Sequence, residues 1–317
     1  MRLYLISLIV LFVSCVPSPE TAFFEVTTYN AYALFDGYDD GTEFDGFRHS
    51  DGYDGEAYRN RIRELAVLLG RDYSTSDVII LQEVESVEVL SDLLDAGLDE
   101  KGYQYYGLAD DGSGGLYVGF ISKTEPLSGA LHFYPGCRPI LELSFLSNGE
   151  VIRIFGVHFR SQLDGGDSER YEQSMHLSHL MEESAGILSI AVGDFNFDPR
   201  LTGPFTLFPD LYNPDNAFHI TGDPSKAGEK LYYSPLVDPD IILTEKGTYF
   251  YEGSWYLYDN VLMTSECWDG KGFEYDSVEI KVNRNMKDML DRPLKYDSSI
   301  GYGYSDHFPV TLRIRAK

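Results

Sequence analysis

Acids, amides and histidines recur in this chain at or just past the ends of short apolar runs. The positions with this pattern are Asn30, Glu83, His158, Asp194, Asn196, Asp259, Asp306 and His307. The end of a strand in a packed sheet is a rigid place from which to present a polar group, whereas an ionisable group inside an apolar run is costly to bury. We therefore expect the functional site at these strand ends.

Three short motifs concentrate these residues. Leu-Gln-Glu-Val at 81–84 closes an early apolar run, Gly-Asp-Phe-Asn at 193–196 follows another, and Ser-Asp-His-Phe-Pro at 305–309 opens the last one. The two-residue period of a strand places Asp194 and Asn196 on the same side of the chain. Carboxylates from distant strand ends can converge on one cleft, where their oxygens suit a hard divalent cation. In isolation, Asp194 and Asn196 could equally form a turn.

Strands dominate the elements that must position these residues. Apolar runs predict strands at 24–29, 78–81, 103–106, 116–122, 140–145, 151–158, 188–192, 241–243, 249–251, 261–263 and 308–314. Helical periodicity is found at 56–69, 87–94 and 169–182. Many strands with few helices predict an α/β (α+β) fold, a four-layer sandwich of two packed, mostly antiparallel β-sheets flanked by helices. Residues 23–317 contain no linker, low-complexity tract or repeat, so we expect them to form a single domain.

The first 22 residues have the composition of an export signal. Arg2 precedes an apolar run at 3–13, which is too short for a permanent membrane span, and a Pro/Ser/Glu stretch follows Cys15. The segment ending at Cys15 resembles a bacterial lipobox, although Phe12 replaces the usual leucine. We expect residues 1–22 to be a signal peptide and short tether, with lipidation at Cys15 anchoring the protein to a bacterial membrane. An ordinary cleaved signal, giving a periplasmic or secreted protein, is the alternative.

The net charge argues against general affinity for nucleic acid. Fifty-one acids against 25 bases give a net charge of −26, which repels polyanions over a Debye length of about 8–10 Å. A bound divalent cation or a local basic strip can still reverse the sign at one cleft. The one clearly basic stretch lies at 281–295, and it could be either a phosphate-steering loop or a solvated surface.

Three further features leave alternatives open. Cys137 and Cys267 could form a disulfide in an exported protein or be two unrelated thiols. The acidic segment 36–54 is predicted to be a long loop, solvated rather than calcium-binding, because its match to a calcium loop is poor. Alternating aromatic residues at 249–258 indicate cross-strand packing, or else a wall on which a base, sugar or lipid headgroup could stack.

Taken together, the motifs resemble those of the endonuclease/exonuclease/phosphatase superfamily. These are metal-dependent phosphoesterases that share the pancreatic deoxyribonuclease-like fold. Gly-Asp-Phe-Asn followed about a hundred residues later by Ser-Asp-His-Phe-Pro, with Gln-Glu-Val about a hundred residues earlier, is a specific combination. The resemblance covers essentially the whole mature chain, so residues 23–317 are expected to be one catalytic domain. Val157 and Tyr32 depart from the pattern of DNA-repair relatives, which weakens a repair function more than a hydrolase function.

The resemblance implies a metal side of the site. Glu83 would be the principal ligand, Asn30 would orient Glu83 or share the ion, and Asp306 would complete the acidic cluster. The implied cofactor is Mg²⁺, with Mn²⁺ as a working substitute.

The resemblance also implies residues for the chemical step. Asp194 would orient or deprotonate the attacking water, and Asn196 would hold a phosphate oxygen. His307, oriented by Asp259, would hydrogen-bond the scissile phosphate, and His158 would assist the leaving oxygen. A His–Asp pair favours the protonated imidazole, so we predict an elevated pKa for His307. His158 could instead be a structural histidine, and Asp259 a loop acid.

Arg160, two residues past His158, is implied as a bidentate phosphate ligand. The expected function is an exported phosphoesterase that hydrolyses phosphodiester bonds in DNA, RNA or nucleotides. A phosphatase or a sphingomyelinase-like phospholipase on the same core is the first alternative, and a non-catalytic surface-binding lipoprotein is the second. The expected partners are the substrate and a membrane through the lipid anchor, and no protein partner is implied.

Overall fold

The computed structural model describes residues 22–112, 115–162, 166–183, 186–201, 206–208 and 218–317. The expected signal segment and the lipidation site Cys15 lie outside the described residues, so both stay predictions. Within the described part of the chain, no helix is long and apolar enough to cross a membrane.

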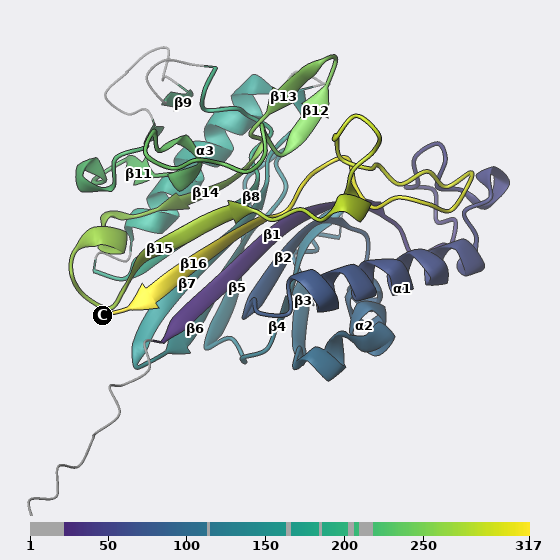
Figure 1. Cartoon of the computed structure of the whole chain (residues 1–317), viewed down its shortest axis with the longest axis horizontal. Coiled ribbons are helices and arrows are strands. Elements are labelled where there is room, and N and C mark those ends of the chain that lie inside the picture. The colour runs from purple at the N-terminus through teal and green to yellow at the C-terminus, as the bar shows by residue number, and fades with distance from the viewer. Residues whose placement is uncertain (1–21, 113–114, 163–165, 184–185, 202–205, 209–217) are drawn as a thin grey trace, which may run out of the picture.

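Two large sheets form the centre of the molecule (Figure 1). The six-stranded sheet has the order β15 (Phe273–Ile280), β16 (Val310–Ala316), β1 (Phe23–Leu34), β2 (Val78–Val84), β4 (Tyr117–Ser122) and β3 (Tyr105–Leu108). The eight-stranded sheet has the order β5 (Ser128–His132), β6 (Ile140–Ser147), β7 (Glu150–His158), β8 (Leu188–Asp194), β14 (Asp259–Met263), β11 (Leu231–Tyr233), β10 (Phe218–Thr221) and β9 (Thr206–Phe208). A separate hairpin joins β12 (Tyr249–Tyr251) to β13 (Ser254–Tyr256).

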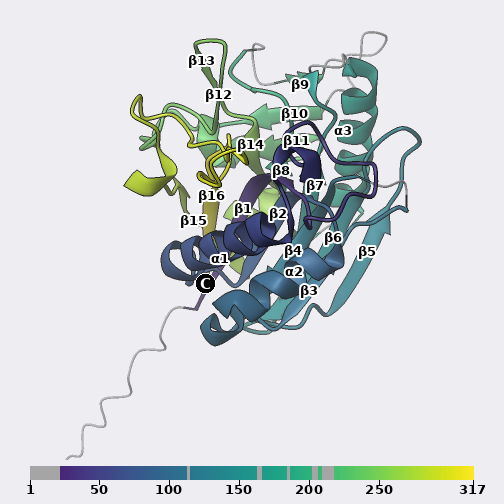
Figure 2. The same ribbon diagram turned by 90° about the vertical axis from the view of Figure 1, so that its right-hand side faces the viewer.

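Helices cover the outer faces of both sheets. Helices α1 (Gly55–Asp72) and α2 (Val87–Leu93) lie over the six-stranded sheet, and α3 (Asp167–Glu182) lies over the eight-stranded sheet (Figure 2). A π-helical turn, Leu94–Leu98, extends α2. Short 3₁₀ turns occur at His49–Asp51, Asp99–Lys101, Pro224–Lys226, Pro235–Val237, Ser265–Trp268 and Arg284–Met286. The main apolar core lies between the sheets, and a second core lies under α3. This arrangement confirms the predicted four-layer sandwich.

The topology brings the site residues to one edge. Strand β1 runs parallel to β2 in one sheet, and β7 runs parallel to β8 in the other. A hydrogen bond from Asn30 of β1 to Asp194 of β8 joins the two pairs near their carboxyl ends. Strands β14 and β16 run antiparallel to β8 and β1, so their amino ends lie at that same edge. Glu83, His158, Asp194 and Asp259 lie at or next to these strand ends, whereas Asn30 lies inside β1 directly before a bulge, and Asp306 and His307 lie in the segment that leads into β16.

Some local predictions were wrong. Residues 241–243 do not form a strand, because the run follows a turn at Pro239 and Ile242 is 94% exposed. The strand expected at 103–106 begins two residues later, at Tyr105. Among the described residues, strands β5, β9, β10, β11, β13 and β15 were not predicted, since they are short or half polar. Cys137 and Cys267 are free thiols, so the disulfide alternative is wrong.

Candidate active site

Backbone pairing places three of the site residues side by side. Asp194 ends β8, and its neighbours in register are His158 at the end of β7 and Asp259 at the start of β14. Asp259 is therefore a strand residue rather than a loop acid. Because β-sheet register fixes the distance between paired residues, these three side chains meet in a rigid frame.

His307 and Asp259 form a buried pair. The two residues are 6% and 0% exposed, and Nδ1 of His307 lies 2.7 Å from Oδ2 of Asp259. Burial lowers the pKa of His307, but the charges of Asp259, Asp194 and Asp306 outweigh burial and raise it to about 10. This direction confirms the predicted elevation of the His307 pKa, and the imidazole is protonated at neutral pH.

A hydroxyl contact holds the His307 backbone, and an aromatic contact holds its ring. The backbone N–H of His307 donates to Oγ of Ser305, and that hydroxyl donates to the carbonyl of Asn30. Tyr249 stacks on the imidazole with 4.6 Å between ring centroids. Tyr249 also stacks on Tyr258. Phe250 of β12 contacts its cross-strand partner Trp255 of β13 edge-on, which bears out the cross-strand packing interpretation of the aromatic stretch.

Asp194 is buried between the two halves of the site. It accepts hydrogen bonds from the backbone N–H of Asn196 at 2.8 Å and from Nδ2 of Asn30 at 3.1 Å. Its Oδ2 lies 3.8 Å from Nε2 of His307 and 3.7 Å from Nε2 of His158. Burial raises the pKa of Asp194 to about 7, against the lowering effect of His307. A carboxyl with this pKa can exchange a proton near neutral pH.

Glu83 and Asn30 form the side of the site suited to a cation. Nδ2 of Asn30 donates to Oε1 of Glu83 at 3.1 Å as well as to Asp194, so one amide links the two carboxylates. The backbone N–H of Ala33 donates to Oε2 of Glu83 at 2.7 Å. Glu83 itself has a positive φ of 63°, which turns its side chain out of the end of β2.

Asp306 lies beside Lys295 and His307. Its Oδ2 lies 3.2 Å from Nζ of Lys295, and its Oδ1 lies 4.0 Å from Nε2 of His307. Among the described residues, each oxygen of Glu83 accepts one hydrogen bond, which leaves lone pairs for a cation. Mg²⁺ is commonly bound through one or two carboxylates, with water and substrate phosphate completing its shell. Glu83, Asn30 and Asp306 fit that donor set.

His158 is placed as a neutral group. It is buried, and burial together with the charges of Arg138 and His307 holds its pKa well below the ordinary value. Its Nε2 lies 3.9 Å from Oε1 of Glu83, and its Nδ1 is buried without a hydrogen-bond partner among the described residues. An unpaired buried nitrogen is costly, and such groups are concentrated at functional sites.

Asn196 and Arg160 lie beside the catalytic acids. Asn196 has a positive φ of 48°, and its Nδ2 donates to the carbonyl of Phe159 at 3.0 Å, so the side chain is held in place. Arg160 follows the end of β7 and is exposed, and its backbone N–H donates to Gln173 of α3.

Sequence reasoning missed Arg138. Its Nη1 lies 3.4 Å from the carbonyl of Phe159. Burial lowers the pKa of Arg138, and the nearby carboxylates of Glu83 and Asp194 act in the opposite direction by raising it. Arg138 thus adds a second guanidinium near Arg160. The signal that could have found it is an arginine-proline pair directly before the apolar run at 140–145.

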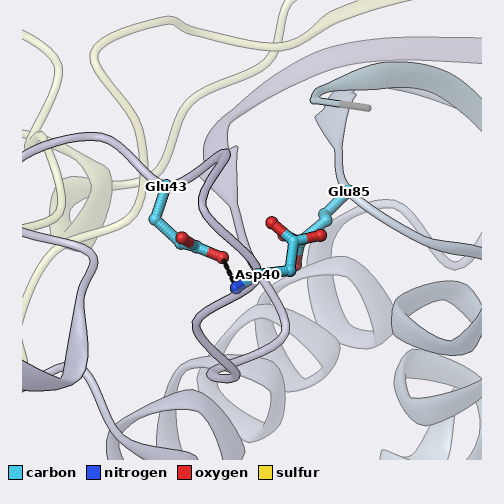
Figure 3. A group of neighbouring side chains, drawn as sticks. All are labelled: Asp40, Glu43 and Glu85. Carbon is cyan, nitrogen blue, oxygen red and sulfur yellow. Dashed lines mark hydrogen bonds between the residues drawn. The ribbon is translucent and has the colours of Figure 1, made fainter. Parts of the chain in front are cut away.

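A second acidic group joins the loop 36–54 to the residue that follows β2. Asp40, Glu43 and Glu85 form the acidic triad, among the described residues, whose ligand atoms all lie within 4.8 Å of one another. Figure 3 shows the carboxylates of Asp40 and Glu85 side by side, with the Asp40 amide bonded to Glu43. Burial, reinforced by the charges of Asp36 and Asp40, raises the pKa of Glu85 to about 8.

Most basic side chains of the stretch 281–295 form ion pairs with acids. Lys287 pairs with Glu245, and Arg292 pairs with Asp288. From this stretch, Lys295 contacts the site through Asp306 and lies 4.1 Å from the ring centroid of Tyr32. The pairing favours the solvated-surface interpretation for most of the stretch.

The sequence matches no protein-family model and no curated protein. Solved structures are similar in fold. An endonuclease/exonuclease/phosphatase family protein from Bacteroides thetaiotaomicron shares 17% identity at a TM-score of 0.59, covering 94% of this chain and 99% of that one. The mannosyl-6-phosphatase of Bacteroides thetaiotaomicron VPI-5482 shares 17% sequence identity at a TM-score of 0.58, and the match covers 92% of this chain and 99% of that one. Humanized D. rerio TDP2 shares 15% sequence identity at a TM-score of 0.58, and the match covers 92% of this chain and 98% of that one. The chain therefore has the fold of the endonuclease/exonuclease/phosphatase superfamily.

Proposed function

We propose that this protein is an exported, divalent-metal-dependent phosphoesterase whose preferred bond is a phosphodiester. The observation that carries the proposal is the convergence of Glu83 from one sheet with Asp194 and the His307–Asp259 pair from the other, with the side-chain amide of Asn30 linking Glu83 to Asp194. Phosphoester hydrolysis requires charge neutralisation, an aligned water and a stabilised leaving group, and these residues can provide all three.

Glu83, Asn30 and Asp306 would hold the cation. A bound Mg²⁺ or Mn²⁺ supplies neutralisation of charge on the phosphate oxygens. Asp194 takes the proton of the attacking water, since its raised pKa matches neutral pH while Asn30 and the Asn196 amide hold its orientation.

The cationic groups bind the phosphate. Protonated His307 donates from Nε2 to a phosphate oxygen, because Nδ1 is engaged with Asp259. Arg138 and Arg160 would add guanidinium donors. The side-chain amide of Asn196, which uses one N–H on the Phe159 carbonyl, would offer its second N–H to the phosphate. His158, on the far side of Asp194 from Asp259 in strand register, would assist the leaving oxygen as a neutral N–H donor, and the proton that Asp194 removes from the water would return to that oxygen through solvent.

The substrate class has two candidates. D. rerio TDP2, which has the same fold, has been solved in complex with a single-strand DNA product, and this supports a nuclease-like activity. The mannosyl-6-phosphatase of similar fold supports a phosphatase. The net charge of −26 and the pairing of Lys287 and Arg292 with acids favour a small phosphoester or a phospholipid headgroup over long nucleic acid.

Hydrolysis assays test the proposal. The chain lacking residues 1–22 is assayed with bis(p-nitrophenyl) phosphate, p-nitrophenyl phosphate and supercoiled DNA, each with Mg²⁺, with Mn²⁺ and with chelator. We expect metal-dependent turnover that Asp194→Asn abolishes, while Asp95→Asn, an exposed acid on the turn after α2, keeps wild-type activity. If the folded protein turns over none of these substrates, the proposal fails. The next candidate is then a phospholipase with narrow substrate specificity, and the one after it is a non-catalytic surface-binding lipoprotein.

Export and anchoring are tested separately. In a bacterial host, the full chain is expected in the membrane fraction with lipid on Cys15, and Cys15→Ser is expected to release it. A wild-type chain that is soluble in the periplasm would favour an ordinary cleaved signal.

A further inference from the structure

Strand β1 contains a bulge directly after Asn30. Asn30 lies opposite Gln82 of β2 and Leu34 lies opposite Val84, so β1 advances four residues where β2 advances two. Tyr32 and Ala33 within the bulge have positive φ values of 52° and 47°. Left-handed backbone is unfavourable for residues other than glycine and persists only where surrounding contacts enforce it.

Arg61 of α1 supplies those contacts. Its Nη1 donates to the carbonyl of Ala33 at 2.7 Å, and its Nη2 donates to the carbonyls of Ala31, at 3.0 Å, and Tyr32. The side chain is only 4% exposed. Its guanidinium lies over the rings of Phe47, Tyr53 and Tyr296, with 4.3 Å to the centroid of Tyr296.

The bulge points its amides at the predicted cation ligands. The N–H of Ala33 donates to Oε2 of Glu83 at 2.7 Å, and the N–H of Tyr32 donates to Oδ1 of Asn30 at 2.9 Å. The carbonyls at the other ends of these two peptide groups, those of Tyr32 and Ala31, both accept hydrogen bonds from Arg61. One planar side chain therefore fixes the peptide groups whose opposite ends orient Glu83 and Asn30.

We infer that Arg61 is a positioning residue for the cation site, acting on Glu83 and Asn30 through the bulge at Ala31–Ala33 without touching either. An arginine suits this place because its rigid fork bonds several carbonyls at once and stacks on aromatic faces, which a lysine ammonium cannot reproduce. Among the described residues, no acid forms a salt bridge with Arg61. Burying its charge for stability alone would be unfavourable compared with an apolar side chain.

The test compares Arg61→Met and Arg61→Lys with Ile62→Ala. Ile62 is the next residue of α1 and is equally buried, so its truncation destabilises the same helix and leaves the carbonyl contacts intact. The first readout is hydrogen exchange of the Ala33 amide relative to the Ile80 amide in the centre of β2, because that ratio separates local opening from global unfolding. The second readout is the Kd for Mn²⁺ measured by titration calorimetry on the full chain.

In Arg61→Met, we expect Ala33 to exchange faster relative to Ile80, and the Kd for Mn²⁺ to rise about 10- to 100-fold, the usual loss when an orienting partner of a ligand is removed. Arg61→Lys should give intermediate values, and Ile62→Ala should change neither readout. An Ala33/Ile80 ratio in Arg61→Met no higher than in Ile62→Ala would overturn the inference; Arg61→Lys takes over this comparison where Arg61→Met does not fold.

The cation readout rests on the proposed function, whereas the exchange readout does not. A wild-type chain that binds no Mn²⁺ would contradict the proposed function, and the exchange ratio would still decide whether Arg61 fixes the bulge. Unchanged Mn²⁺ affinity in a variant whose Ala33 amide has opened would show that the bulge does not act on the cation ligands, and this too would overturn the inference.

Discussion

Nδ1 of His307 lies 2.7 Å from Oδ2 of Asp259, and both side chains are buried. Burial alone lowers the pKa of the imidazole, but Asp259, Asp194 and Asp306 together raise it to about 10. In Asp259→Asn we expect the pKa of His307 to fall, because the partner with the largest raising effect is removed. NMR titration of the histidine ring signals with chelator present measures this, and a wild-type value below about 6.5 would contradict the assignment.

The same shift makes stability depend on pH. Because the folded-state pKa of His307 lies above the unfolded value, its protonation stabilises the fold fully below about pH 6.5, and this contribution is lost as the pH rises toward 10. Each unit of pKa difference corresponds to about 1.4 kcal/mol. Urea unfolding between pH 6.5 and 9.5 should show a steeper loss of unfolding free energy in the wild type than in Asp259→Asn.

The stacking of Tyr249 on His307 gives a third prediction. Replacing the ring in Tyr249→Leu should lower kcat about 2- to 10-fold, because an aromatic pair contributes about 0.5–1.5 kcal/mol. Tyr249→Phe keeps the ring and should keep wild-type kcat, with KM little changed in both variants. Steady-state kinetics on bis(p-nitrophenyl) phosphate measure kcat and KM for both variants and the wild type. Equal losses in the Phe and Leu variants would assign the effect to the hydroxyl instead.

Arg138 is expected to bind the substrate phosphate. Arg138→Gln should lower kcat/KM about 10- to 100-fold, since a hydrogen bond to a charged group contributes about 1.5–3 kcal/mol. The control is Arg63→Gln, an exposed arginine of α1 whose one hydrogen bond within the described part of the chain goes to Asn60, and this variant should behave as the wild type. Wild-type kinetics in Arg138→Gln would leave Arg138 with a purely structural role at the Phe159 carbonyl.

The sequence marks the candidate site residues because many of them lie at the ends of apolar runs. The structure brings Glu83, Asp194 and Asp259 together through the antiparallel pairing of β14 with β8 and through Asn30, which links Glu83 of one sheet to Asp194 of the other. The same local signal misplaced a strand at 241–243, where an apolar run follows a turn and Ile242 faces solvent.

Long-range contacts account for what the sequence could not show. The left-handed backbone at Tyr32 and Ala33 is enforced by Arg61, which lies on a helix and bears no motif of its own. Arg138 is likewise unmarked except by the proline that follows it. Such residues become visible only when the fold places them against the strand ends.

Salt dependence separates a polymeric from a small substrate. A nuclease that holds DNA through 6–10 phosphate contacts loses about 10³- to 10⁵-fold in affinity between 50 and 200 mM salt. The chain carries a net charge of −26, and Lys287 and Arg292 pair with acids, so we expect turnover of bis(p-nitrophenyl) phosphate to change less than about twofold over this range and DNA cleavage to be weak at either salt. Initial rates at saturating Mg²⁺ measure both. Strong DNA cleavage with a steep salt response would instead show that the rim loops form a nucleic-acid groove despite the overall charge.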